Sequence, residues 1–422
     1  MYKNHLLFLY FILNINKIRK VVIDLSIKKY KFTKENSFKI NEFKTKDKGE
    51  FKNREEAVEE FVSNLKEIHL LQQKLYAERK ESVVFVFQAM DAAGKDGTIR
   101  TVFSTLSPHG VKEFCFKAPS VEELSHDYLW RFWSALPSKG HISIFNRSYY
   151  EDVLVGKVHK LYENQLVPNR LKSVDVITKR YKEINDFERY LYNNGTRVIK
   201  IFLNVSKEEQ AKRFISRIDT PRKNWKISEG DIKEREYWDE YQEAFESMVN
   251  KTSCKTSPWY VVPADHKWYA RLIVSRIVLN TLKEINPQFP TISDEQLEKV
   301  QAYRDELVKS LNKDTKKESK NKDKKDKKHK EKKEDKKVYD ELPDDVKEEM
   351  ESVFVNASAI VTDGIIEEEQ EKVAEKEKES TTKNIDEVSI TDVKFATNED
   401  DGIANHLHEV LQQNQSTKKQ EN

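Results

Sequence analysis

The sequence is poor in cysteine and has a single long apolar run. Its 422 residues include two cysteines, Cys115 and Cys254, which are far apart and fit no metal-ligand spacing. This pattern argues against a disulfide framework or a zinc site and favours two reduced thiols in a cytoplasmic protein. The apolar run at residues 5–15 is too short to cross a bilayer, which takes about 20 residues, and no small-residue cleavage site follows it. We therefore expect neither a membrane span nor a signal peptide.

Aromatic residues are scarce in the last quarter of the chain. All six tryptophans lie between Trp130 and Trp268, whereas residues 313–422 contain almost no aromatic residues. Charged residues make up 35% of the whole chain, against about 25% in an average globular domain. The segment 313–422, which is charged and poor in aromatic residues, cannot bury enough apolar surface to offset the conformational entropy that ordering would cost. We predict an N-terminal extension at 1–25, one folded domain at 26–288, a possible helix at 289–312 and a disordered charged tail at 313–422, which is lysine-rich at 313–337 and acidic or polar at 338–422.

Within the predicted domain, short apolar runs alternate with segments of helical periodicity. Residues 82–88 (SVVFVFQ) form a continuous apolar run, typical of a parallel strand buried on both faces, and apolar residues recur at helical spacing in residues 55–78. Further strands are expected at 111–116, 141–145, 197–204 and 259–262, and further helices at 98–106, 121–135, 169–193, 207–217, 231–250 and 267–285. The alternation predicts a doubly wound α/β sheet with about five parallel strands and ligands beyond their carboxyl ends.

The first candidate site follows the apolar strand and reads AMDAAGKDGT, residues 89–98. A phosphate-binding loop needs a strand, a glycine-containing turn, a lysine and a helix N-terminus, and all four occur here in that order. The match to G-x-x-x-x-G-K-[ST] is imperfect, because Ala89 replaces the first glycine and Asp96 replaces the serine or threonine. A surface turn that opens a helix remains the alternative. We predict catalytic roles for Asp91 and Lys95, and phosphate or nucleotide contacts from Ala93, Gly94, Asp96, Gly97 and Thr98.

The second candidate site is the end of another apolar strand, IFNRSYYED at residues 144–152. A second strand end beside a phosphate-binding loop usually supplies an acid for the metal. Here that position holds Asn146, whose amide oxygen can coordinate a metal directly or through water. The planar fork of Arg147 suits phosphate oxygens, with a surface salt bridge as the alternative. For Tyr149 and Tyr150 we favour core packing.

The third candidate is a cationic segment at residues 218–230, which lies between two expected helices. Its cations, and those of the helix before it, would repel one another unless an anion lay between them. This pattern predicts a lid over phosphates, although a solvated helix connection remains the alternative. Trp225 suggests a lid hinge or a surface for a base. We predict phosphate or nucleotide contacts from Arg213, Arg217, Lys223 and Lys226.

Five blocks in order carry a family resemblance: FQAMDAAGKDGTIR, FKAPSVEELSHDYLWR, IFNRSYYEDVLV, RFISRIDTPRKNWKIS and SPWYVVPADHKWYARL. Together they resemble the family-2 polyphosphate kinases over roughly residues 26–285. The resemblance implies a P-loop kinase fold of three layers, similar to thymidylate kinase, with an Arg/Lys-rich lid. It also implies that Asp91 and Asn146 serve Mg²⁺ and that Lys157 replaces an arginine which often contacts phosphate. Asn146 resembles the subgroup that acts on both nucleoside mono- and diphosphates.

The function implied by this resemblance is the reversible, Mg²⁺-dependent transfer of a phosphoryl group from inorganic polyphosphate to ADP and/or AMP by a homo-oligomer. One alternative is an ATP-dependent nucleoside monophosphate kinase, against which Asp91 and Asp96 in the loop argue. The other is a non-catalytic polyanion-binding protein, against which the intact set of Lys95, Asp91 and Arg147 argues. The formal net charge of +2 gives no reason to expect a specific nucleic-acid partner.

Overall fold

A computed structural model describes residues 27–319, with gaps at 35–36, 167 and 172–174. The predicted N-terminal extension and residues 320–422 of the predicted tail lie outside the described residues. Within the described part of the chain, none of the helices combines the length and the apolar character of a membrane-crossing segment.

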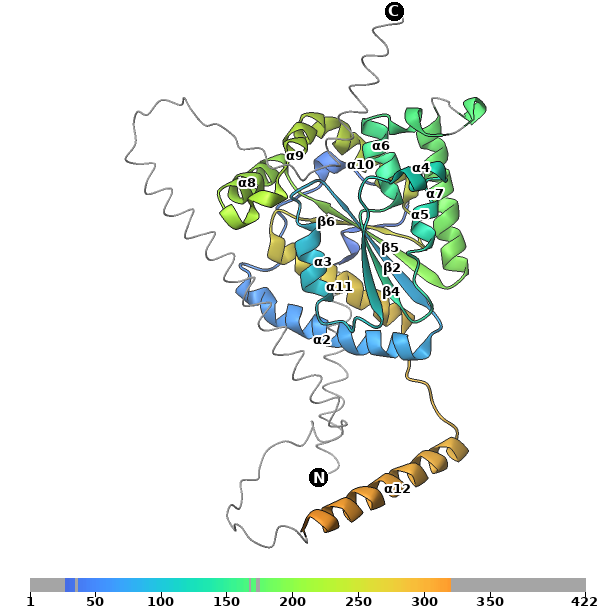
Figure 1. Cartoon of the computed structure of the whole chain (residues 1–422). Helices are drawn as coiled ribbons and strands as arrows, with labels where there is room; N and C mark the ends of the chain where they lie inside the picture. The colour runs from blue at the N-terminus through green and yellow to red at the C-terminus, as the bar shows by residue number, and fades with distance from the viewer. Residues whose placement is uncertain (1–26, 35–36, 167, 172–174, 320–422) are drawn as a thin grey trace, which may run out of the picture.

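In the part of the chain that the structure describes, six strands form one sheet in the order β1-β6-β5-β2-β4-β3 (Figure 1). The strands are β1 Lys31–Phe32, β2 Ser82–Ala89, β3 Val111–Cys115, β4 Ile142–Asn146, β5 Thr196–Asn204 and β6 Trp259–Pro263. The last five are parallel, which confirms the predicted sheet, while β1 pairs antiparallel with β6. Seven of the eight residues of β2 are buried, because this central strand is covered on both faces.

Helices cover both faces of the sheet and give the three layers that were predicted (Figure 1). On one face α11 packs against α2 and α3, and on the other α7 packs against β5 and α10. The helices are α2 Glu55–Glu78, α3 Lys95–Phe103, α4 Val121–Ser125, α5 Trp130–Trp133, α6 Val155–Val158, α7 Val176–Asn193, α8 Lys207–Ile218, α9 Glu229–Lys233, α10 Trp238–Thr252, α11 Lys267–Ile285 and α12 Asp294–Ser319. The 3-10 helices are η1 Ile40–Glu42, η2 Tyr149–Val153, η3 Leu161–Asn164, η4 Asn169–Leu171, η5 Pro221–Lys226 and η6 Glu234–Tyr237.

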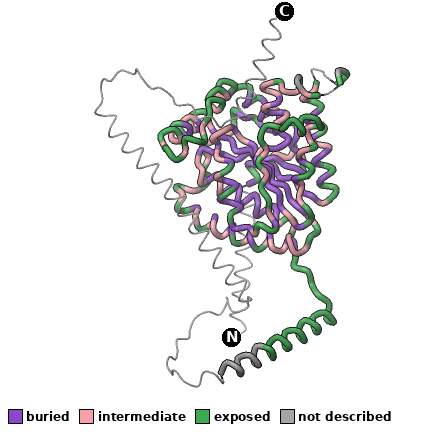
Figure 2. Tube along the Cα trace, in the orientation of Figure 1, coloured by how far each residue is buried: buried purple, intermediate pink, exposed green. Residues whose placement is uncertain are grey.

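Three of the expected helices are divided, and one of these, 169–193, contains η4 and α7. The segment 121–135 contains α4 and α5, because the chain is extended at His126 and the Asp127 carboxylate accepts a hydrogen bond from the Leu129 N–H at 3.0 Å. The segment 231–250 is interrupted by η6 before α10 begins. The helix α12 is exposed at every residue from 294 to 310, so it adds nothing to the core shown in Figure 2.

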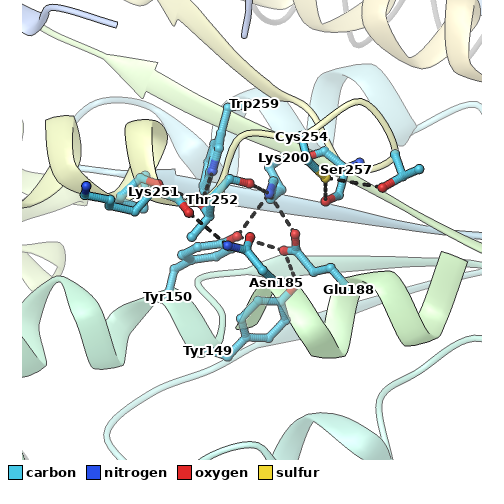
Figure 3. Close-up of polar contacts among 12 residues, drawn as sticks. Tyr149, Tyr150, Asn185, Glu188, Lys200, Lys251, Thr252, Cys254, Ser257 and Trp259 are labelled. Atoms are coloured by element: carbon cyan, nitrogen blue, oxygen red, sulfur yellow. Dashed lines mark hydrogen bonds and ion pairs between the residues drawn. The ribbon is translucent and has the colours of Figure 1, made fainter. Parts of the chain in front are cut away.

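A buried ion pair anchors the segment that follows β4 (Figure 3). The Lys200 ammonium of β5 lies 2.7 Å from the Glu188 carboxylate of α7, and both side chains are fully buried. Glu188 also accepts hydrogen bonds from the hydroxyls of Tyr149 and Tyr150, at 2.9 and 2.8 Å, and Lys200 donates to the Thr252 carbonyl. Burial lowers the pKa of Lys200, while Glu188 opposes that shift. Since each charge has hydrogen-bonded partners, the pair is tolerated inside the protein and fixes η2 against α7 and β5.

We predict that Lys200→Met lowers the free energy of unfolding by about 3–5 kcal/mol, because it leaves the Glu188 carboxylate buried without its cation. Urea denaturation measures this change. The control is Lys251→Met, which alters an exposed lysine on α10 and should change stability by less than about 0.5 kcal/mol. Equal effects of the two substitutions would contradict a stabilising role for the buried pair.

Candidate active site

The loop between β2 and α3 has the backbone of a phosphate-binding turn. Gly94 has φ 102° and Ala92 has φ 59°, a left-handed conformation that is rare for a residue with a Cβ atom. These two residues turn the chain so that the N-terminus of α3 opens toward the loop, where backbone N–H groups favour an anion. Lys95 begins α3, is largely buried, and donates from Nζ to the Ala89 carbonyl at 3.0 Å. Its burial lowers its pKa, with Asp91 acting in the opposite direction.

The ends of β2 and β4 bring the first two candidate sites together. Asn146 is in register with Phe87, and the Arg147 N–H donates to the Phe87 carbonyl at 3.1 Å. Arg147 has φ 65°, and its guanidinium Nη2 lies 2.9 Å from Asp91 Oδ1. The expected proximity of these residues is therefore present in the structure.

Glu151 is a member of this cluster to which the sequence assigned no role. It belongs to η2, four residues after Arg147, and burial raises its pKa although Arg147 and Lys95 act to lower it. Nothing in the sequence singles out Glu151, because it does not stand directly at the strand end and glutamate is a common residue. The carboxylate adds a second negative group, besides Asp91, beside the two cations.

A cleft of about 1830 Å³ opens above the loop and receives residues from the carboxyl-terminal side of all five parallel strands. Twelve lysines and arginines line it, against six aspartates and glutamates. This excess of positive charge suits a polyanionic ligand. The cations are Lys95, Arg100, Lys117, Arg147, Lys212, Arg213, Arg217, Arg222, Lys223, Lys226, Lys267 and Arg271.

All but one of the predicted site residues line this cleft: Asp91, Ala93, Gly94, Lys95, Asp96, Gly97, Thr98, Asn146, Arg147, Arg213, Arg217, Lys223 and Lys226. The exception is Lys157 in α6, whose Nζ lies 3.1 Å from Glu243 of α10. Its assignment to phosphate stays a prediction. Two lining cations that the sequence did not single out, Lys267 and Arg271, stand four residues apart at the start of α11, a spacing that places both on one helix face.

Arg213 is placed differently from the other predicted phosphate contacts. Its guanidinium is buried and donates to the carbonyls of Ala93, at 2.7 Å, and Asp265, at 3.0 Å, with further bonds to Ala92 and Ala264. Its Nε donates to Glu209 at 2.9 Å. All three guanidinium nitrogens therefore bind protein atoms. Through these bonds Arg213 holds the phosphate-binding loop against α8 and the end of β6.

The cationic segment after α8 forms η5 and leads into α9. Arg217 is half-buried and donates to the Lys226 carbonyl at 3.2 Å. Trp225 is 78% exposed, with the Lys226 ammonium 5.0 Å from its ring. An indole this exposed contributes little to the core, so both roles expected for Trp225 stay predictions.

The donor atoms near the loop fit a magnesium ion shared with phosphates. Asp91 and Asp96 supply carboxylates, and Asn146 supplies an amide whose nitrogen donates to Asp96 at 2.9 Å. Within the described ranges, no group of three or more His, Cys, Asp or Glu side chains could hold a metal by itself. Magnesium is usually bound through one or two carboxylates together with substrate phosphates, and this donor set suits that arrangement.

Comparison with known proteins identifies the family. The family model described as polyphosphate kinase 2 matches residues 51–290, more than half of the chain. The chain belongs to the polyphosphate kinase 2 family. An ADP-polyphosphate phosphotransferase of Rhodopseudomonas palustris is 47% identical over 57% of this chain and 83% of its own length. An AMP/ADP-polyphosphate phosphotransferase of Meiothermus ruber is 43% identical over 63% of this chain and 96% of its own length.

A solved structure, that of polyphosphate kinase 2 from Arthrobacter aurescens, shares the fold with a TM-score of 0.59. It is 35% identical, and the match covers 65% of this chain and 95% of the other. The region matched by the polyphosphate kinase 2 model includes every predicted site residue, from Asp91 to Lys226.

We predict that Arg213→Lys lowers the free energy of unfolding by about 2 kcal/mol, because a lysine cannot replace the charge-assisted bonds to buried carbonyls. The same variant should lose catalytic activity, since the loop is no longer fastened. Arg217→Lys is the matched comparison, with an expected stability change within about 0.5 kcal/mol. Thermal and urea unfolding measure both variants. A stability loss shared equally by the two would argue against a fastening role for Arg213.

Proposed function

We propose that this protein transfers phosphoryl groups from inorganic polyphosphate to ADP and/or AMP with the help of Mg²⁺. The observation that carries the proposal is the single cleft in which the phosphate-binding loop, the Asp91–Arg147 pair and the cations of α8 and η5 meet. The names of the relatives from R. palustris and M. ruber support polyphosphate as donor and a nucleotide as acceptor.

The reaction exchanges one phosphorus–oxygen bond for another. An oxygen of the terminal phosphate of ADP or AMP forms a bond to the terminal phosphorus of polyphosphate. The bond from that phosphorus to its bridging oxygen breaks, and the chain leaves one phosphate shorter. Such transfer depends mainly on positioning and on neutralising the charge of the transferred group.

We assign this work to two cations. Lys95 begins α3, at a helix N-terminus whose backbone N–H groups favour an anion, and Arg147 directly follows the end of β4. Each can neutralise charge on the phosphate oxygens as the bond breaks. The cations of the lid and α11 line the rest of the cleft, where a long anionic donor chain would extend.

Asp91, with Asn146 and Asp96 beside it, is the group that we assign to Mg²⁺. The ion, when bound with the phosphates, supplies further neutralisation of their negative charge. The expected cytoplasmic location and homo-oligomeric assembly also belong to this proposal, and light scattering of the purified protein would measure the assembly.

We expect purified protein with Mg²⁺ and long-chain polyphosphate to form ATP from ADP, and ADP from AMP, with no ATP added. Lys95→Ala should lower kcat by roughly 100- to 1,000-fold, the usual effect of removing one donor to the transition state. Lys182→Ala changes an exposed lysine of α7 and should retain activity. Chromatographic measurement of the nucleotides separates the products. Activity that requires ATP and a monophosphate instead of polyphosphate would overturn the proposal.

A second expectation concerns the metal. Asp91→Asn should raise the Mg²⁺ concentration that gives half-maximal activity by roughly tenfold, because the site loses a charged oxygen ligand. The control Asp239→Asn alters an exposed acid of α10 and should leave the Mg²⁺ titration unchanged. An unchanged titration in the Asp91 variant would exclude Asp91 as a magnesium ligand.

A further inference from the structure

The amide of Asn146 is held between two carboxylates. Asn146 ends β4, is 7% exposed, and donates from Nδ2 to Asp96 Oδ1 at 2.9 Å and to Glu113 Oε1 at 3.1 Å. Asp96 comes from the first turn of α3, and Glu113 comes from β3, the strand paired with β4. All three side chains line the cleft.

This arrangement uses both hydrogens of the amide nitrogen. A carboxylate only accepts hydrogen bonds, whereas an amide NH₂ group has two N–H donors. The two acids therefore determine that the nitrogen end of the amide faces them. The reversed amide would place its oxygen against two negative groups and lose two charge-assisted bonds. The Asn146 oxygen is therefore directed away from Asp96 and Glu113.

A thiol is the third polar group beside the amide. The thiol of Cys115, also in β3, lies 3.4 Å from Glu113 Oε1 and 3.6 Å from the Asn146 nitrogen. An aspartate at position 146 would bring a third carboxylate beside Asp96 and Glu113, which both lie within hydrogen-bond distance of the amide nitrogen.

We propose that Glu113 is a positioning residue of the active site, which fixes the Asn146 amide and makes a hydrogen-bond donor necessary at position 146. The proposal rests on the proposed function, because the oxygen directed by Glu113 is the one assigned to the metal–phosphate complex. Glu113 and Asn146 thus form a coupled pair: the acid at 113 sets which side chain at 146 supports phosphoryl transfer.

The pair can be reversed without changing its net charge. In the wild type, a carboxylate at 113 accepts from an amide at 146, whereas Glu113→Gln with Asn146→Asp places the amide at 113 and the carboxylate at 146. We expect Asn146→Asp alone to lower kcat/KM at least roughly tenfold, because three carboxylates then repel the phosphates and one another. The double variant should recover part of this loss, because the glutamine introduced at 113 then donates to the carboxylate at 146 while Asp96 still faces it. The matched control, Glu122→Gln with Asn146→Asp, neutralises an exposed acid of α4 and should recover none.

A pH profile separates positioning from a merely structural effect. Crowding of three carboxylates raises their pKa values, so the acid limb of the kcat/KM profile should move to higher pH in Asn146→Asp and move part of the way back in the double variant. Circular dichroism and thermal unfolding of each variant establish that it folds. Additive effects of the two substitutions on kcat/KM, with no recovery in the double variant, would overturn the proposal.

The coupling between positions 113 and 146 can also be measured without an activity assay. A double-mutant cycle on the free energy of unfolding near neutral pH should show that Asn146→Asp destabilises the protein less when Glu113→Gln is present. Absence of polyphosphate-dependent activity in the wild type would reject the proposed function alone, and the unfolding cycle would still decide the pairing. A cycle with no coupling energy would reject the pairing even in an active enzyme.

Discussion

The structure of the active site depends on the pairing of β2 with β4. The register that sets Phe87 opposite Asn146 brings the phosphate-binding loop and Arg147 to the same edge of the sheet, and the Arg147 N–H closes the pairing on the Phe87 carbonyl. Arg147 takes a left-handed backbone there, a conformation that costs energy in a residue with a side chain. The next turn of the chain opposes this strain, because Tyr149 and Tyr150 are held in the core by Glu188, the partner of Lys200. A buried ion pair far from solvent thus maintains the position of a surface arginine.

The cations of the cleft act in two distinct ways. The guanidinium of Arg213 donates to protein carbonyls and so holds the phosphate-binding loop in place. Arg217 lies one turn later on the same helix and donates to the Lys226 carbonyl. A helix that presents cations at this spacing can therefore hold the phosphate-binding loop with one residue and reach the cleft with the next. The same sequence pattern would count both as phosphate ligands, and only burial distinguishes them.

Local signals in the sequence predicted much of the fold and of the cleft. Four of the five parallel strands are recognisable because burial on both faces favours apolar runs, whereas the edge strand β3 has no buried residue. The loop is recognisable because phosphate binding requires its turn, Lys95 and a helix start in sequence order. The two-residue strand β1 was missed, since it exists only through its pairing with β6. Glu113 and Glu188 were missed for a similar reason. Glu113 binds Asn146, 33 residues away, and Glu188 binds Lys200, 12 residues away, and no periodicity in the sequence marks either acid.

The acids in this cleft present a physical problem that its geometry resolves. A site for polyphosphate should exclude negative charge, yet six acids line this cleft. Three of them, Asp91, Asp96 and Glu113, come from the phosphate-binding loop, α3 and β3. Each has a donor in the protein: Arg147 for Asp91, and the single amide of Asn146 for the other two. Under the function that we propose, an anionic chain in the cleft would offer phosphate oxygens to Arg147, and a divalent cation would compensate Asp91 for the loss of its guanidinium partner. Under that proposal, opening the Asp91–Arg147 ion pair would release a cation for the polyphosphate donor and a carboxylate for the metal.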